Sequence, residues 1–212
     1  MPPDSQTQSE SARNKILGAA AEEILSNGFQ SASVSSILRK SNVSKGCFYH
    51  HFETKQALGL AVLEESFIDI VRQIWEPIFD SDNPLAALIA LLNGEVRQLE
   101  EHDVKVGCPI NNLAQEMSPI DDAFRQRIEL IHQVWKQRLT KALQKSQQNG
   151  QMLPTADAKA VATLTIATTQ GAIGIAKNSQ RKESFFEYTQ GLVQYLSSLQ
   201  IQQQENNHVQ SI

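Results

Sequence analysis

Apolar residues recur at intervals of three and four positions along most of the chain, which is the period of amphipathic helices. Ile16, Ala20 and Ile24 mark the first such face. Asn27-Gly28 follows as a helix stop, since glycine readily takes the left-handed conformation past a last turn. No run alternates between apolar and polar residues as a half-buried strand would. The pattern therefore predicts an all-α fold of about nine helices. By residue number they are expected at about 9–27, 34–38, 44–51, 54–79, 84–99, 108–117, 121–149, 155–176 and 184–199.

The two ends of the chain differ in composition from its middle. Residues 1–8 are polar and contain prolines, and residues 201–212 are rich in Gln and Asn, so we expect a flexible tail at each end. Between the tails, we expect an N-terminal three-helix head over residues 9–53 that contains a helix-turn-helix, followed by a C-terminal helical body over residues 54–200.

The segment 33–55 reads SVSSILRKSNVSKGCFYHHFETK and is the most informative part of the sequence. It contains two helices too short to be stable alone, joined by a three-residue turn at 41–43. Asn42 stands where this turn needs a residue that tolerates left-handed angles. Ser33 and Ser44 are expected to cap the two helices through their side-chain oxygens. The pattern predicts a helix-turn-helix.

The outward face of the second short helix carries an unusual set of side chains. Lys45, Cys47, Tyr49 and His50 remain exposed when the apolar residues of the segment face inward. A cation next to aromatic groups that can form hydrogen bonds suits the major groove of DNA, where base edges present donors, acceptors and methyl groups. We therefore interpret this face as a DNA-reading surface.

The run NVSKGCFYHHFETK, from Asn42 to Lys55, resembles the helix-turn-helix of the TetR family of transcriptional regulators. The family's usual run is Gly-Val-Ser-Lys-Gly-Thr, an aromatic residue or Leu, then Tyr-x-His-Phe-x-(Ser or Thr)-Lys. The upstream run RNKILGAA and the pair that follows the first helix, Gly-Phe, are also similar to the family, so the resemblance covers residues 11–60. Asn42 replaces the common Gly. Cys47 replaces the common Thr or Ser and so lacks a hydroxyl at an expected DNA contact.

The resemblance implies particular roles in binding double-stranded DNA. Lys45 and His50 are expected near bases, and the Tyr49 hydroxyl near a phosphate. Phosphate contacts, which set register without reading sequence, are expected from Ser33 and Lys55. The complete expected contact set is Ser33, Ser44, Lys45, Cys47, Tyr49, His50 and Lys55. The neighbouring His51 reads either as packed structure or as a further contact.

For the body, the resemblance implies dimerisation and the sensing of a small molecule. Small residues on one side of the last two helices, with apolar neighbours, fit a two-fold four-helix interface or an intramolecular core. These are Ala167, Gly171, Gly174, Ala176, Leu192, Val193 and Leu196. Amide and aromatic side chains are expected to line an effector pocket, although the amides equally suit helix caps or bridges. The pocket candidates are Phe67, Trp75, Asn111, Asn112, Gln115, Phe124 and Trp135.

Composition and motifs narrow the class of protein. The net charge is −4, yet residues 9–56 hold six Lys and Arg against four Asp and Glu, which fits a basic head on an acidic body. No signal peptide, membrane span, metal-ligand spacing or catalytic motif is found, so we expect a cytoplasmic protein that is not an enzyme and needs no cofactor. Two cysteines suggest no disulfide framework. The sequence predicts a repressor that binds a near-palindromic operator as a homodimer and is released by an effector. The weaker alternatives are an enzyme and an adaptor that has lost DNA binding.

Overall fold

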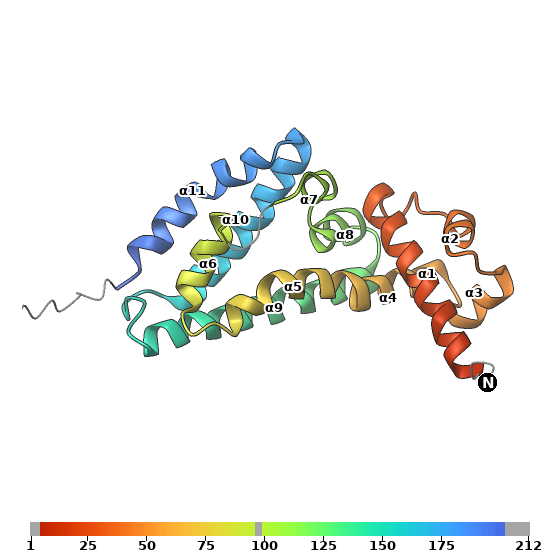
Figure 1. Cartoon of the computed structure of the whole chain (residues 1–212), viewed down its shortest axis with the longest axis horizontal. Helices are drawn as coiled ribbons and strands as arrows, with labels where there is room; N and C mark the ends of the chain where they lie inside the picture. The colour runs from red at the N-terminus through yellow and green to blue at the C-terminus, as the bar shows by residue number, and fades with distance from the viewer. Residues whose placement is uncertain (1–4, 96–98, 202–212) are drawn as a thin grey trace, which may run out of the picture.

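The computed structural model describes residues 5–95 and 99–201, and these form an elongated helical molecule with the head at one end (Figure 1). The predicted all-α fold is confirmed. Within the described ranges the only strand-like pairing is an isolated bridge between Met152 and Gln200. The helices are α1 (Ser5–Asn27), α2 (Val34–Ser41), α3 (Lys45–His51), α4 (Lys55–Ala61), η1 (Val62–Phe67), α5 (Ile68–Phe79), α6 (Pro84–Leu92), α7 (Glu101–Val106), α8 (Pro109–Met117), α9 (Asp122–Gln148), α10 (Ala158–Ser179) and α11 (Lys182–Ser198).

The ends of the two short head helices are fixed by local hydrogen bonds. Ser33 Oγ accepts the N–H of Ser36 at 3.0 Å, and Ser44 Oγ accepts the N–H of Cys47 at 3.2 Å. Each bond satisfies one of the free N–H groups in a first helical turn. Asn42 closes α2 in the left-handed conformation, with φ of 53°. The predicted caps and turn are therefore confirmed.

The helix that joins head to body is continuous from α4 through η1 to α5, but its middle is π-helical. The sequence predicts one regular helix over 54–79, so the π segment is a departure. A π turn accommodates an extra residue and rotates the side chains that follow it, and such segments are frequent at functional sites.

Several predicted boundaries were wrong. Helix α1 begins at Ser5, inside the predicted tail of residues 1–8, while residues 1–4 and 202–212 lie outside the described residues. The helix predicted over 84–99 ends at Leu92, because Gly94 has a φ of 74° and the N–H groups of Gly94 and Glu95 bond back to α6. Val96 lies outside the described residues. Helix α7 was not predicted.

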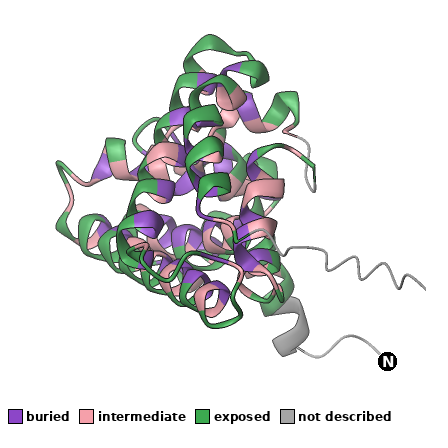
Figure 2. Ribbon diagram, turned by 90° about the vertical axis from the view of Figure 1, so that its left-hand side faces the viewer, coloured by how far each residue is buried: buried purple, intermediate pink, exposed green. Residues whose placement is uncertain are grey.

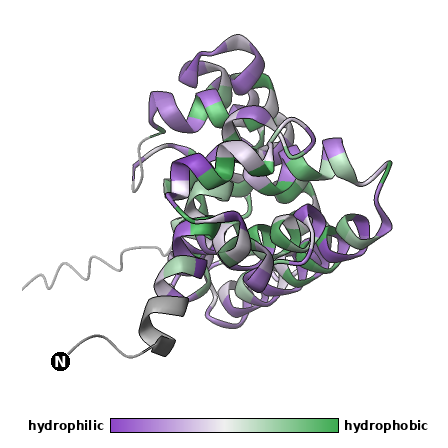
Figure 3. Cartoon of the chain, turned by 90° about the vertical axis from the view of Figure 1, so that its right-hand side faces the viewer, coloured by the Kyte–Doolittle hydropathy of each residue, from purple (hydrophilic) through white to green (hydrophobic). Residues whose placement is uncertain are grey.

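The buried residues form two apolar clusters on the inward sides of the helices (Figures 2 and 3). The first contains the apolar faces of α1 to α3 together with residues from η1, α8 and the start of α9, including Phe67, Ile110 and Phe124. The second lies between α5, α6, α9, α10 and α11 and includes Trp75 and Trp135. The core of the head is thus completed by residues of the body.

Candidate nucleic-acid interface and buried cavity

Helix α3 presents the predicted reading surface on its exposed side. Phe48, fully buried, anchors the helix in the head, and Tyr49 beside it is 46% exposed. The Lys45 ammonium lies 6.0 Å from the centroid of the Tyr49 ring, and His50 is exposed on the same short helix. Cys47 is half-buried. The structure therefore brings a cation, a phenol and an imidazole together at the tip of the head.

No contact or backbone angle within the described residues requires glycine at position 46. Its backbone is helical, and a Cβ built there would meet no atom within 4 Å among the described residues. Glycine weakens a helix relative to alanine because it has more conformational freedom to lose. An open glycine in the middle of the candidate surface suits the close approach of another molecule, such as a nucleic-acid backbone.

The other predicted contact residues have partners inside the chain. Ser33 and Ser44 act as the helix caps described above. The Lys55 ammonium donates to the carbonyl of Gln30 at 2.9 Å and lies 4.7 Å from the centroid of the Phe29 ring. Burial lowers the pKa of Lys55 below its ordinary value. Lys55 therefore faces the loop of the head itself and is not displayed beside Lys45.

His51 lies against the core of the head. Its Nε2 atom is buried and has no hydrogen-bond partner within the part of the chain that the structure describes. Burial first, and then the charges of His50 and Arg13, lower the pKa of His51. The ring is therefore neutral near pH 7, and the geometry favours the packed reading over a DNA contact.

Glu116 near the end of α8 holds the loop between α1 and α2, a contact that sequence reasoning missed. The backbone N–H groups of Phe29 and Gln30 donate to its two carboxylate oxygens, each at 2.8 Å. Gly28, with φ of +82°, lets the loop pass close to this carboxylate. The Phe29 ring packs on Phe124 with centroids 4.9 Å apart. We call the contacts of Phe29, Gln30, Glu116 and Phe124 the head–body seam.

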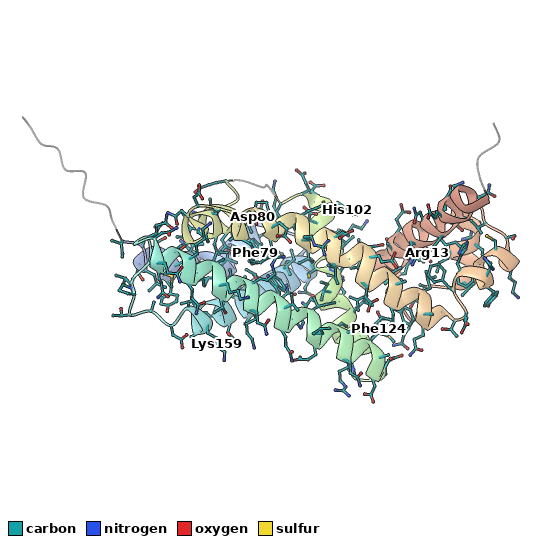
Figure 4. The ribbon with its side chains drawn as sticks, turned by 90° about the horizontal axis from the view of Figure 1, so that it is seen from below. Arg13, Phe79, Asp80, His102, Phe124 and Lys159 are labelled. Carbon is teal, nitrogen blue, oxygen red and sulfur yellow. The ribbon has the colours of Figure 1, made fainter. Side chains whose placement is uncertain are left out.

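A second link joins α1 to the π segment. The Arg13 guanidinium donates to both carboxylate oxygens of Glu65, at 2.5 and 2.7 Å, and lies 5.4 Å from the centroid of the Phe52 ring. Figure 4 labels Arg13 in the head and Phe124 at the start of α9. The bidentate pair lowers the pKa of Glu65. The head is therefore attached to the body on two sides, through η1 and through α8.

A cavity of about 260 Å³ lies inside the body and reaches the head. The rings of Trp75 and Trp135 meet edge-to-face in its wall, with centroids 4.8 Å apart and planes at 73°. Leu25 of α1 reaches it from the head, and Cys108 and Pro109 line it at the start of α8. The other walls come from α5, α6, α7, α10 and α11. The space is mostly apolar, as small-molecule sites usually are.

Only part of the predicted pocket set lines this cavity. Trp75 and Trp135 do, whereas Phe67 and Phe124 are buried in the other apolar cluster. The amide candidates lie outside the lining, because Asn111 donates to the backbone of Gln170, Asn112 donates to the carbonyl of Val106, and Gln115 is exposed. Asn111 and Asn112 therefore bridge helices, which is the alternative that the sequence left open. The other lining residues were missed because no local pattern marks a void between helices.

The Cys108 thiol faces this cavity from the beginning of α8. Burial raises its pKa, and hydrogen bonds from the backbone of Asn111, the side chain of Gln170 and the backbone of Ile110 oppose that rise. Burial is the largest effect, so the sulfur is protonated near neutral pH. Within the described residues, no three His, Cys, Asp or Glu side chains are grouped so that they could hold a metal ion. None of the described helices is long and apolar enough to cross a membrane.

Known proteins with similar sequences are regulators of transcription. Residues 16–62 match the model of the bacterial regulatory proteins of the tetR family, and residues 84–191 match the tetracyclin repressor-like C-terminal domain. The transcriptional regulator AcuR of Cereibacter sphaeroides is 28% identical over 84% of this chain and 82% of its own length. The transcriptional repressor DhaR of Mycobacterium sp. strain GP1 is 29% identical over 83% of this chain and 87% of its own.

The solved structures agree with the sequence comparisons. A regulatory protein TetR from Rhodobacter sphaeroides superposes with a TM-score of 0.77 at 28% identity, over 87% of this chain and 98% of that one. The capped helix-turn-helix, together with these matches, defines a DNA-binding regulator of transcription. Because the two domain models together match most of the chain, the protein belongs to the TetR family.

Proposed function

We propose that two copies of this chain bind a near-palindromic operator, and that a small molecule in the cavity between α5, α9 and α10 releases the DNA. Repression is the favoured mode, because the related DhaR of Mycobacterium is named as a repressor. The observation that carries the proposal is the face of α3, where Lys45, Tyr49 and His50 surround an open Gly46. Such a face suits base edges and phosphates in the major groove.

A two-fold dimer fits the exposed side of α10 and α11. Leu164 and Ile175 on α10, and Tyr188 and Tyr195 on α11, are large apolar or aromatic side chains that remain exposed. Cβ atoms at Gly171 and Gly174 would meet nothing within 4 Å, so another helix can approach this side closely. Ala176, Leu192 and Leu196, which the sequence also suggested for the interface, are buried within the chain. To reach successive turns of the major groove, a dimer through this side must hold its two reading helices about 34–36 Å apart, one turn of DNA.

Helix α8 is the physical route from the cavity to the head. Its first residues, Cys108 and Pro109, border the cavity, and Glu116 near its other end holds the N–H groups of Phe29 and Gln30. A ligand that displaces α8 therefore changes the position of the loop that precedes α2. The shift in DNA affinity equals the difference in ligand affinity between the two arrangements and cannot exceed it.

Binding of labelled duplexes from the upstream region of the gene, followed by fluorescence anisotropy over a salt series, tests the proposal. We expect a specific complex that weakens steeply with salt, because phosphate binding releases counterions. Lys45→Ala should weaken it by about tenfold, since a contact of about 1.4 kcal/mol corresponds to that factor. Lys136→Ala, which removes a cation of α9 in the body, is the matched control and should leave affinity unchanged. Equal weak binding to every duplex by all three proteins would instead support an adaptor that has lost DNA binding.

A further inference from the structure

The wall of the cavity is built mainly from hydrocarbon side chains. The aromatic rings of Trp75, Trp135, Phe185 and Phe186 line it, together with aliphatic side chains of α1, α5, α6, α7 and α10. The two indole rings already meet edge-to-face, which is an arrangement that aromatic side chains prefer. A molecule inside the cavity therefore contacts mostly carbon.

The hydrogen-bonding side chains of the wall are shielded or already engaged. Trp135 Nε1 and Gln170 Oε1 have no partner within the described residues, but both atoms have essentially no accessible surface. A molecule in the cavity therefore does not touch them. The Gln170 side chain also hydrogen-bonds the Cys108 thiol, and the Thr169 hydroxyl donates to the backbone carbonyl of Thr165 at 2.9 Å. These residues therefore line the cavity without presenting a free donor to its contents.

The charged residues of the lining favour a neutral ligand. No Lys or Arg lines the cavity in the described ranges, so nothing there balances an anion. Asp103 is engaged in its own helix, where its carboxylate accepts the N–H of Glu100 at 3.1 Å at the start of α7. His102 lies in the lining but is exposed to solvent (Figure 4). A charge or an unpaired hydroxyl among the remaining apolar walls would lose its hydration without compensation.

We infer that the cavity takes an uncharged, hydrocarbon-like molecule, such as an alkyl-substituted aromatic ring, and holds it by shape and burial without a hydrogen bond. This inference rests on the proposed function, since it names the chemical class of the effector of the same cavity. An apolar cavity of ~150 Å³ stays dry and binds benzene. The volume here is about 260 Å³, so in proportion the cavity has room for roughly ten non-hydrogen atoms.

Four probes of nearly equal size separate the chemistries: ethylbenzene, benzyl alcohol, benzylamine and benzoate, titrated at neutral pH, where the last two are charged. The first three differ only in the methyl, hydroxyl or ammonium group on a common benzyl frame. The chain contains two tryptophans and both line the cavity, so intrinsic fluorescence of the full-length protein reports its occupancy. The rise in Tm is a second readout, because a ligand that binds only the folded state stabilises it.

We expect ethylbenzene to bind at least about tenfold more tightly than each of the other three, because an unpaired hydroxyl or charge is costly to bury. Ile173→Trp places a larger side chain in the wall and should remove most of the rise in Tm that ethylbenzene causes. The matched control is Ile120→Trp, the same change at a side chain that is 61% exposed and outside the lining. This control should keep the full rise in Tm.

Equal or tighter binding of benzyl alcohol, tighter binding of either charged probe, or no response to any probe up to its solubility limit would each overturn the inference. A full rise in Tm in a folded Ile173→Trp variant would also overturn it, and the probe series on the unmodified protein decides independently of that variant. Release of bound operator by ethylbenzene is measured separately by anisotropy. Selective binding without release would support the inferred ligand chemistry and contradict the proposed function. Release of DNA without fluorescence or Tm response would contradict the inference alone, because the molecule would then act at another site.

Discussion

The head–body seam provides the most direct test of how this molecule is held together. Glu116 accepts two backbone N–H groups, from Phe29 and Gln30, across 87 and 86 residues of sequence. Removing its carboxylate leaves both N–H groups without this acceptor, and the loop before α2 loses its tie to α8. We therefore expect Glu116→Ala to loosen the head while the second apolar cluster stays intact.

The expected free-energy change follows from these contacts. A hydrogen bond to a charged group contributes about 1.5–3 kcal/mol, and we take the lower end because the Gln30 bond lies at exposed surface. Glu116→Ala should therefore lower the free energy of unfolding by about 2–3 kcal/mol. Glu116→Gln keeps one acceptor oxygen and should lose roughly half of that. For a chain of this size each kcal/mol corresponds to roughly 2–4 °C in Tm.

Urea unfolding measures the change in the free energy of unfolding, and hydrogen exchange shows which amides lose protection. The amides of Phe29 and Gln30 should exchange faster in Glu116→Ala, while amides in α10 keep their rates. Gln115→Ala, an exposed change on the same helix, controls for the effect of substitution in α8. Unchanged exchange at the two amides, together with wild-type stability in Glu116→Ala, would refute the reasoning.

Three further predictions address the reading face, the dimer and the cavity thiol. Gly46→Ala should raise Tm slightly, because alanine favours helix, yet weaken operator binding in anisotropy; tighter binding would contradict a close approach there. Tyr188→Glu should shift the protein toward monomer in sedimentation velocity, because a charge placed at this position opposes apolar association. Lys159→Glu, on the same helix pair, is the control and should leave the dimer unchanged. An unchanged dimer in Tyr188→Glu would count against this interface. In a Cys47→Ser background, Cys108 should react with iodoacetamide more slowly than free cysteine below its raised pKa, because less thiolate is present, and faster as pH rises through that pKa. A rate equal to free cysteine at neutral pH would contradict this burial.

The helix-turn-helix was readable from the sequence because its determinants are local. Ser33 and Ser44 bond three residues ahead, and Asn42 adopts its left-handed angles within a three-residue turn. The exposed character of Tyr49 also follows from helical periodicity once Phe48 is assigned to the core. Such features depend on spacing along the chain, so the sequence alone displays them.

The cavity and the seam were not readable because they depend on contacts between distant segments. Glu116 gives no sign in the sequence that its partners are the backbone N–H groups of a loop more than 80 residues away. Asn112, predicted to face a ligand, donates to Val106 and accepts from Lys177 on α10. The end of α6 is different, because its signal is local. Asn93-Gly94 is a typical helix stop and could have ended the predicted helix at the correct place.

The head and the body therefore follow one another along the chain, but they do not have separate cores. Ile16 of α1 and Phe67 of η1 share one apolar cluster with Phe124 of α9, so the head cannot move without repacking residues of the body. Close-packed cores tend to switch between discrete arrangements instead of deforming smoothly. Leu25 is partly buried against this cluster and also lines the cavity. Under the proposed function, a molecule that fills the cavity thus acts on α1, the helix that supports α2 and α3. Binding of DNA and binding of effector then favour different arrangements of this shared core.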